Sequence, residues 1–473
     1  MDVHNRPMVT SPAPVRAFQV PTRQQRAAAK RHRPGPAPRP GFARCCEAIA
    51  GVGLGVVIGS VVLSESRGAL AAPGGLITAV GRVSGFIGAY AMLVMVILIA
   101  RLPWLERSVG QDRLLRWHRR SAPWAMGLIL THVATVTIGY AALGKASIPS
   151  QFWAFLSSYP DMLAALVGLL LLVMASVSSI RIARRKMKYE SWWIVHLYTY
   201  LGLTLVFMHQ IRTGASFLSH PLARALWLAV WLFSGALVFS FRWLLPIAKN
   251  LRHRLKVASI AEEAPGVYSI ICTGRHLDRL GVSGGQFFQW RFLARGMWWQ
   301  AHPFSISALP RPPFLRLTVK ALGDQSAALS SLPIGTRVMI EGPYGAFTHH
   351  SRTSDRVALI GAGIGVTPIR SMLEDLPRDI DVVTIVRAHA EADLIHHEEI
   401  TALSRERNAQ LIESLGSRHE VPLDAAAVKS MVPDIAGRDV YVCGPDGFTH
   451  DMIDALRRNR VPMSQIHVEA FAF

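Results

Sequence analysis

Four histidines in apolar surroundings are the residues of this 473-residue chain whose spacing first suggests chemistry. His118 and His132 lie at the start and in the middle of one apolar stretch, and His196 and His209 lie in another. In a helix, the 14-residue spacing separates the first pair by about 21 Å and returns to within about 40° of the same face. The 13-residue spacing spans about 20 Å but turns the helix by about 140°, so overwinding or a bend, for instance at Gly202, is expected.

These spacings give two matched levels, with His118 opposite His196 and His132 opposite His209. Polar, metal-capable side chains inside hydrocarbon are rare and usually functional. Two facing imidazoles can fill both axial positions of a haem iron, which favours electron transfer over oxygen binding at the iron. The alternatives are histidines that donate to neighbouring backbone carbonyls and, for His118, a place at the interface among arginines. We predict that the four histidines are the axial ligands of two b-type haems.

A second chemical feature is the glycine-rich run VALIGAGIGVTP at residues 357–368. It leads from a predicted strand through three glycines into a helix, where the backbone can approach a pyrophosphate and the helix N-terminus offers N–H donors. The proline suits the first turn of that helix. The sequence YVCGP at 441–445 follows another predicted strand. A glycine triplet alone is weak evidence, but the combination predicts a dinucleotide site.

A bundle of apolar helices must position the histidines. Six stretches are each close to the roughly 20 residues that a helix needs to cross hydrocarbon. They lie near residues 48–63, 76–100, 123–143, 162–180, 192–211 and 222–245. The first stretch is short and is followed by Ala-Leu-Ala at 69–71, so a cleavable signal is the alternative for that stretch.

Basic residues cluster on one side of these six stretches. Besides the N-terminal tail, the clusters are Arg107, Arg113, Arg116, Arg119 and Arg120; Arg181, Arg184, Arg185, Lys186 and Lys188; and Lys249, Arg252, Arg254 and Lys256. The intervening loops are nearly free of Lys and Arg. By the positive-inside rule, we predict a multi-pass protein of the cell membrane with both termini and the C-terminal half in the cytoplasm.

The C-terminal half has a different pattern. After Asn250, short alternating apolar runs interrupted by Gly and Pro are typical of an antiparallel β-barrel. From about Ser354, strands alternate with helical segments, which indicates a parallel α/β sheet. The predicted fold is therefore an α-helical membrane bundle followed by an antiparallel β-barrel domain and an α/β nucleotide-binding domain. The predicted boundaries are a disordered basic tail at 1–42, the membrane domain at 43–247, the barrel at 250–350 and the α/β domain at 351–473.

Composition agrees with this division. Hydrophobic residues make up 51% and charged residues 17% of the chain, and the mean hydropathy is +0.27. A net charge of +20 and a pI of about 10.6 could indicate a nucleic-acid partner. Much of that charge borders the apolar stretches, however, so we predict membrane lipid and not nucleic acid as a partner. The spacing of Cys45, Cys46, Cys272 and Cys443 supports neither a disulfide framework nor an iron–sulfur or zinc-ribbon site.

Several motifs resemble a known family. They are HPFSIS at 302–307, GPYG at 342–345, GAGIGVTP at 361–368, VCGP at 442–445 and an aromatic C-terminus. With the two histidine pairs, they resemble the ferredoxin-NADP reductase-like flavoproteins of the ferric reductase and NADPH oxidase branch, in which a haem-bearing membrane domain precedes the flavin domain. The resemblance covers residues 107–473. The chain departs from the animal oxidases in its short outer loops and in lacking an obvious EF-hand loop.

The resemblance implies an FAD site in the barrel domain. The residues that would hold FAD are His302, Pro303, Phe304 and Ser305, with the Ser305 hydroxyl near the reactive edge of the flavin. Lys320 would meet an FAD phosphate. In isolation, Pro303 would be interpreted as an ordinary turn residue.

The resemblance also implies a nicotinamide dinucleotide site. The residues that would cradle the dinucleotide or lie near its nicotinamide are Gly361, Gly363, Gly365, Thr367, Cys443, Gly444 and Pro445. Phe473 would cover the flavin ring and give way to nicotinamide, with Phe471 as the competing residue. Arg387 follows the second strand of the sheet, where a 2′-phosphate needs a cation, so it favours NADPH over NADH. A solvated Arg387 and a core role for Cys443 are the alternatives.

These features together predict a transmembrane oxidoreductase. NAD(P)H gives hydride to FAD, and single electrons pass to the inner and then the outer haem, and on to an acceptor outside. Ferric iron chelates are the first choice of acceptor, dioxygen giving superoxide the second, and a partner redox protein the third. A membrane channel or scaffold that keeps the fold without turnover is the non-enzymatic alternative. The oligomeric state is left open.

Overall fold

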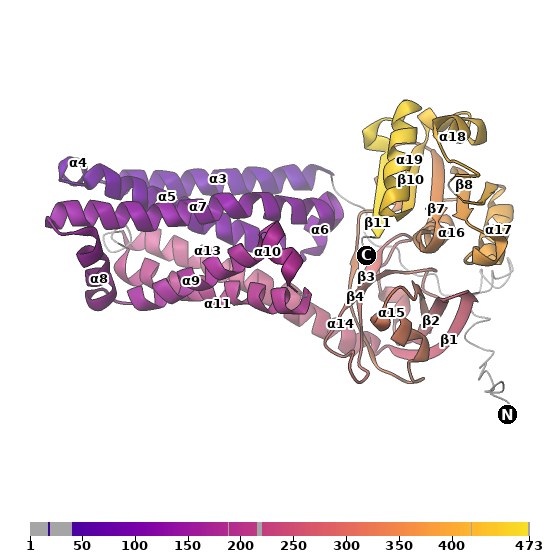
Figure 1. The fold of residues 1–473 in the computed structure, drawn as a ribbon, viewed down its shortest axis with the longest axis horizontal. Helices are drawn as coiled ribbons and strands as arrows, with labels where there is room; N and C mark the ends of the chain where they lie inside the picture. Colours follow the sequence, from indigo (N-terminus) through magenta and orange to yellow (C-terminus); the bar gives the residue numbers. More distant parts are fainter. Residues whose placement is uncertain (1–17, 19–39, 188, 215–219, 418, 472–473) are drawn as a thin grey trace. The chain divides into compact units, whose positions relative to one another are not determined.

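The computed structural model describes residue 18 and residues 40–187, 189–214, 220–417 and 419–471 (Figure 1). The chain forms two compact units. The membrane unit comprises residues 40–105 and 111–243, and the C-terminal unit comprises residues 106–110 and the chain from 244 onward, together with Phe18. Most of the predicted basic tail lies outside the described residues.

Long apolar helices build the membrane unit. They are α3 (Pro40–Ser64), α5 (Gly75–Leu98), α7 (Gln111–Gly144), α9 (Met162–Ser179), α11 (Tyr189–Thr213) and α13 (Pro221–Phe239). The shorter helices are α4 (Arg67–Ala71), α6 (Pro103–Val109), α8 (Ile148–Ser158) and α10 (Arg181–Lys186). Within the described residues, six helices are long and apolar enough to cross a membrane. The predicted bundle is therefore confirmed.

Glycines let the helices of this unit approach closely, as small residues do in membrane proteins. Between α5 and α7, a Cβ atom on Gly81 would lie 2.6 Å from Thr135 Oγ1. Between α9 and α11, a Cβ atom on Gly168 would lie 2.7 Å from the carbonyl oxygen of Gly202. α11 runs through Gly202 as a single helix. Gly202 is therefore a packing residue, and no helix break occurs where the spacing suggested a bend.

The first part of the C-terminal unit is a β-barrel preceded by a helix. A π-helical turn (Ser240–Leu244) leads into α14 (Leu245–His253). The strands that follow are β1 (Lys256–Ala264), β2 (Val267–Thr273), β3 (Phe287–Phe292), β4 (His302–Ser305), β5 (Phe314–Lys320) and β6 (Val338–Tyr344). The short helix α15 (Asp324–Ala328) lies after β5. Two antiparallel sheets, β1-β2-β5 and β4-β3-β6, are joined by the bridges Ile306–Leu317 and Lys256–Arg337. The predicted antiparallel barrel is confirmed.

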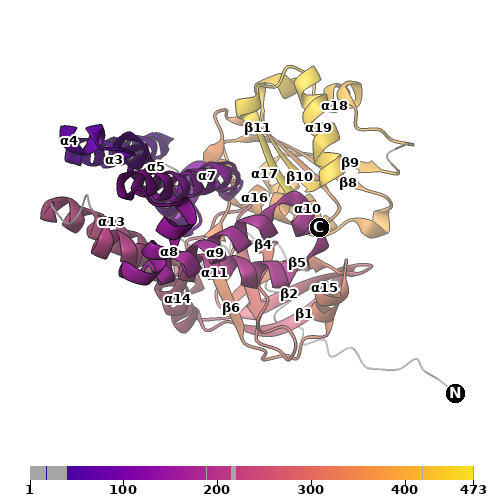
Figure 2. The same ribbon diagram turned by 60° about the vertical axis from the view of Figure 1, so that its left-hand side comes forward.

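The second part is a parallel sheet covered on both faces (Figure 2). Its strands are β7 (Arg356–Ala362), β8 (Asp381–Ala388), β9 (Gln410–Leu415), β10 (Asp439–Pro445) and β11 (Ile466–Phe471), in the order β11-β10-β7-β8-β9. The helices are α16 (Val366–Asp375) and α17 (His397–Arg407) on one face, and α18 (Ala425–Met431) and α19 (Asp446–Arg458) on the other. In such sheets, ligands bind beyond the carboxyl ends of the strands where the strand order reverses, here between β7 and β10.

Candidate redox sites

The first pair of predicted histidines comes together in the membrane unit. The rings of His118 in α7 and His196 in α11 have centroids 6.2 Å apart and planes inclined at 71°. His118 Nδ1 lies 3.2 Å from the carbonyl oxygen of Met95 and therefore donates to it. His196 Nδ1 lies 3.4 Å from the hydroxyl oxygen of Ser179. Because that hydroxyl donates to the Ala175 carbonyl, its oxygen is left to accept from His196.

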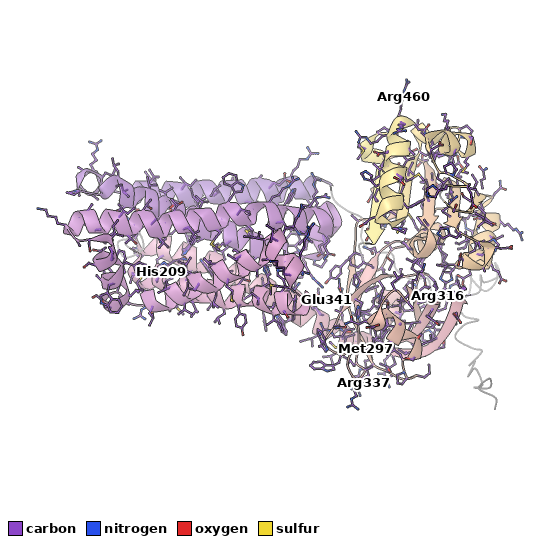
Figure 3. All side chains as sticks on the ribbon, in the orientation of Figure 1. His209, Met297, Arg316, Arg337, Glu341 and Arg460 are labelled. Carbon is purple, nitrogen blue, oxygen red and sulfur yellow. The ribbon has the colours of Figure 1, made fainter. Side chains whose placement is uncertain are left out.

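The second pair lines one cavity within the same unit, and Figure 3 labels one member of the pair, His209. The cavity has a volume of about 220 Å³ and a mostly apolar wall, to which His132 and His209 both contribute. His132 Nδ1 donates to the carbonyl oxygen of Gly81 at 2.8 Å. A Cβ atom on Gly85 would lie 2.5 Å from the same nitrogen, so only glycine leaves room for the ring there. His209 Nδ1 is buried without a hydrogen-bond partner.

The orientation of these rings suits metal coordination. When Nδ1 donates its proton to a fixed oxygen, the imidazole is neutral and its Nε2 lone pair is free for a metal. His118, His132 and His196 all have this arrangement. The acceptors Met95 and Gly81 are themselves 14 residues apart on α5, which matches the spacing of the two histidines on α7. Within the described residues, no cluster of three or more His, Cys, Asp or Glu could hold a metal ion.

Strand β4 carries the predicted FAD motif and leaves two polar atoms without protein partners. Ser305 Oγ and His302 Nε2 are both buried and unpaired. His302 stacks on Phe304 with ring centroids 5.8 Å apart, and burial lowers the pKa of His302. Pro303 is exposed. Buried polar groups without partners are rare in folded proteins, so these atoms fit contacts with a bound polar ring system.

Lys320 lies exposed at the end of β5. The bridge between Ile306 and Leu317 places β5 beside the residues that follow β4. Lys320 is three residues beyond that bridge, which corresponds to about 10 Å along a strand. It can therefore reach an anionic group of a ligand bound along β4.

The glycine run forms the predicted strand–turn–helix. Gly363 has a φ of 54°, in the left-handed region that favours glycine. A Cβ atom on Gly365 would lie 2.3 Å from the carbonyl oxygen of Cys443, so this glycine lets the turn pack against β10. Thr367 is buried, and its hydroxyl donates to the Ile364 carbonyl at 2.9 Å. Gly361, the penultimate residue of β7, pairs with Cys443 of the neighbouring strand β10. The backbone therefore has the shape that a pyrophosphate needs.

Cys443 is fully buried between β7 and α16, and burial raises the pKa of its thiol well above the ordinary value. The thiol is therefore neutral and packed in the core, while the chain beyond it reaches the ligand edge. Gly444 allows Phe448 to approach, because a Cβ atom there would lie 2.8 Å from that ring. Pro445 is exposed and precedes α19.

Arg387 is the penultimate residue of β8, near the carboxyl edge of the sheet, rather than following the strand as predicted, and it is not freely solvated. Its guanidinium donates to Ser414 Oγ at 2.5 Å and to the Ser417 carbonyl at 2.8 Å. Phe473 lies outside the described residues. Phe471 ends β11, paired with Pro445 of β10. The roles predicted for these side chains stay predictions.

Sequence reasoning missed a buried charge network between the barrel and the α/β sheet. Arg316 of β5 makes a two-pronged ion pair with Glu399 of α17 at 2.7 and 2.8 Å. Arg370 of α16, which is fully buried, pairs with Glu399 at 2.7 Å and also with Glu374. Arg311 pairs with Glu374 at 2.7 Å. The network joins the halves that carry the flavin and dinucleotide motifs, and Figure 3 labels one of its members, Arg316.

The charges of this network hold each other ionised. Burial alone would raise the pKa of Glu374, but Arg370 and Arg311 outweigh burial and lower that pKa to about 2. In the same way, Arg370 and Arg316 hold the pKa of Glu399 far below its ordinary value despite burial. Phe18, which is 1% exposed, packs its ring 4.9 Å from the Arg316 guanidinium. Arg316, which lies between two leucines of FLRLTVK, was a sequence signal that a buried arginine needs an acidic partner, although it did not identify that partner.

Three stretches of the chain match known families. Residues 84–207 match the ferric reductase like transmembrane component, residues 272–348 match an FAD-binding domain, and residues 359–454 match an oxidoreductase NAD-binding domain. The second and third stretches contain the motifs of β4, β7 and β10 described above.

Individual proteins are similar over parts of the chain. The glycine betaine monooxygenase reductase subunit of Chromohalobacter salexigens is 28% identical over 185 residues, which cover 36% of this chain and 50% of that protein. Human dual oxidase 2 is 24% identical over 323 residues, covering 62% of this chain and 20% of that protein. The chain thus spans half of these relatives' length or less. The crystal structure of Amycolatopsis cytochrome P450 reductase aligns with 46% of this chain, and the alignment covers 69% of the reductase chain. The sequence identity is 20% and the TM-score is 0.40.

The order of the three family matches agrees with the order of the domains in the structure. A membrane-spanning bundle is followed by an FAD-binding β domain and an NAD-binding α/β domain. The chain thus combines, in this order, a domain like the transmembrane component of ferric reductases, an FAD-binding domain and the NAD-binding domain of oxidoreductases.

Proposed function

We propose that the chain carries electrons from cytoplasmic NAD(P)H, by way of FAD and two b-type haems, to an acceptor on the outer side of the cell membrane. The observation that carries this proposal is the pair of histidine levels on α7 and α11. One level brings the rings of His118 and His196 to a centroid distance of 6.2 Å, and the other places His132 and His209 on one cavity.

Each imidazole pair would hold one haem through its two Nε2 atoms. When bound, FAD links two-electron hydride donors to one-electron acceptors, and a haem with two imidazole ligands carries single electrons. The chain supplies orientation: Met95, Gly81 and Ser179 fix three of the four rings through Nδ1. The mostly apolar wall of the cavity that His132 and His209 line would suit the apolar faces of a haem.

In the C-terminal unit, β4 and the turn after β7 would hold FAD and the dinucleotide. The unpaired Ser305 hydroxyl and His302 Nε2 would hydrogen-bond the flavin, and Gly363 and Gly365 would leave room for the pyrophosphate. Arg387, whose guanidinium donates to Ser414, would pair with a 2′-phosphate, and NADPH would then be the donor.

The orientation rests on the basic clusters at the start of α7 and after α9 and α13. These clusters belong on the cytoplasmic side by the positive-inside rule. Both termini and the C-terminal unit would then be cytoplasmic, and the cavity with His132 and His209 would be near the outer surface.

Ferric iron chelates are the acceptor that we propose, and the match of residues 84–207 to a ferric reductase like component supports them. Dioxygen is the second candidate, because the chain is 24% identical to dual oxidase 2 over 323 residues. Comparing ferric-chelate reduction with superoxide release in oriented membranes separates these two acceptors.

A reduced-minus-oxidised absorbance spectrum of the purified protein tests the proposal. We expect b-type bands and a haem content of two per chain. A protein that contains FAD and no haem would contradict the electron path across the membrane.

A further inference from the structure

Three segments of the C-terminal unit share an unusual composition. Residues 247–257, 293–301 and 333–338 contain six Lys or Arg residues and no Asp or Glu. They are the end of α14 with the start of β1, the loop between β3 and β4, and the turn before β6. We call them together the basic rim.

Backbone hydrogen bonds make the basic rim one continuous surface. The N–H of Val338 donates to the Leu255 carbonyl at 2.9 Å, which joins the first and third segments. The N–H of Leu293 donates to the Arg337 carbonyl at 2.9 Å, which joins the second and third. Figure 3 shows Met297 and Arg337 on the same side of the unit, opposite Arg460.

Large apolar side chains of the basic rim are exposed. Trp298 is 61%, Trp299 42%, Leu251 65% and Ile334 63% exposed. Met297 is 9% exposed and belongs to the barrel core, so it anchors the loop while the two tryptophans stay outside. Arg295 and Arg337 are exposed beside them.

We propose that the basic rim contacts the anionic headgroup surface of the membrane in which this protein is embedded. Tryptophan rings favour the interface between water and hydrocarbon. Basic side chains are attracted to anionic headgroups, and the exposed Arg252, Arg254, Lys256, Arg295 and Arg337 give the required charge complementarity. The helical segment from Pro221, which is apolar enough to span a membrane, ends at His253 inside the first segment of the rim. The rim is thus continuous with a membrane helix.

Lipid contact at the rim fixes the flavin strand. The loop 293–301 leads directly into β4, which begins at His302. Lipid contact on this loop attaches the C-terminal unit to the membrane at a second point, besides the covalent link of the chain to the membrane unit. The proposed lipid contact depends on the membrane location of the chain and not on haem binding. A failure of the proposed electron path would therefore leave it unaffected.

Fluorescence quenching of the full chain in nanodiscs tests the contact. In a Cys45→Ser, Cys46→Ser background, Trp298→Cys is labelled with a fluorophore, and Met463→Cys, an exposed residue outside the rim, is the matched control. With headgroup spin-labelled lipid in phosphatidylglycerol-containing discs, we expect quenching at position 298 to exceed that at 463 several-fold. Equal quenching at the two positions would overturn the proposal.

Charge reversal tests the electrostatic part. Arg295→Glu with Arg337→Glu is expected to reduce quenching at position 298 to the level at 463, whereas Arg457→Glu with Arg460→Glu leaves it high. Discs of phosphatidylcholine alone should weaken quenching in the parent protein. FAD content and flavin reduction by NADPH show that each variant is folded. Quenching that depends on neither the rim arginines nor anionic lipid would contradict headgroup binding.

Discussion

The membrane unit and the C-terminal unit place buried polar groups by different means. In the membrane unit, single polar side chains are satisfied by carbonyls or hydroxyls on packed helices, as His132 is by Gly81. In the C-terminal unit, charges are buried as a connected set, with Arg370 and Glu399 at its centre. A bundle of apolar helices offers few charged partners, whereas the two halves of the C-terminal unit contribute opposite charges to a common interface.

This difference separates two kinds of sensitivity. A change beside a membrane histidine acts locally on one ligand position, because that ring has few partners. A change in the charge network leaves other ions unpaired and alters how the barrel and the sheet meet. Substitutions at the two kinds of site should therefore differ in their effects.

The largest effect is expected from His132→Ala or His209→Ala. Under the proposed ligand assignment, either change removes one axial ligand of the haem near the outer surface, so haem content should fall from two to one per chain and acceptor reduction should be abolished. Reduction of FAD by NADPH should continue, because the C-terminal unit is unchanged. Absorbance spectra and stopped-flow kinetics measure both, and an unchanged haem content would show that the ligand assignment is wrong.

Gly85→Val tests the same level without removing a ligand. The added side chain would occupy the position 2.5 Å from His132 Nδ1 and displace the ring. We expect loss of the outer haem with the inner haem retained. The matched control is Gly127→Val on α7, where a Cβ atom meets nothing within 4 Å. If both variants kept two haems, the close approach of α5 would not position His132.

Glu399→Gln tests the charge network. Breaking a buried ion pair from one side costs about 3 to 5 kcal/mol, so the temperature at which FAD is released should fall by several degrees. The control is Glu406→Gln, whose partner Arg378 is 65% exposed. An exposed pair contributes at most about 1 kcal/mol. Equal effects of the two changes would refute the distinction between buried and exposed pairs.

Acid should weaken the network through Glu374. Its pKa is lowered from 4.5 to about 2 in the folded chain, because Arg370 and Arg311 outweigh the effect of burial. The unfolded chain therefore binds more protons between these values, and stability is lost as the pH falls from about 4.5 toward 2. Glu374→Gln should reduce this pH dependence in unfolding measurements. An undiminished slope would assign the acid sensitivity to other groups.

The smallest effect is expected from Arg387→Ala. Loss of a cation for the 2′-phosphate should raise the KM for NADPH about tenfold, equivalent to about 1.4 kcal/mol, and leave the KM for NADH unchanged. Steady-state flavin reduction with the two donors measures the ratio. Equal changes for both donors would leave Arg387 with a structural role toward Ser414 and Ser417 alone.

The sequence predicted features that depend on local periodicity and missed those that depend on distant contacts. Apolar length located the membrane helices, and helical spacing matched the levels of His118 and His132. The pair between Arg316 and Glu399 joins residues 83 positions apart, and no local pattern encodes it. The hydrogen-bond partners of Arg387, Ser414 on β9 and Ser417 after it, are also distant in the sequence. The sequence alone therefore could not distinguish a hydrogen-bonded Arg387 from a solvated one.

Vectorial electron transfer in sealed liposomes tests whether electrons cross the membrane unit. The purified protein is sealed into liposomes that trap a membrane-impermeant ferric chelate, and NADPH is added to the side that carries the C-terminal unit. Reduction of the trapped chelate is expected, and the His209→Ala variant should not support it. If the trapped chelate stayed oxidised while the same protein reduced chelate added on the NADPH side, electrons would not cross the membrane unit and the account would be wrong.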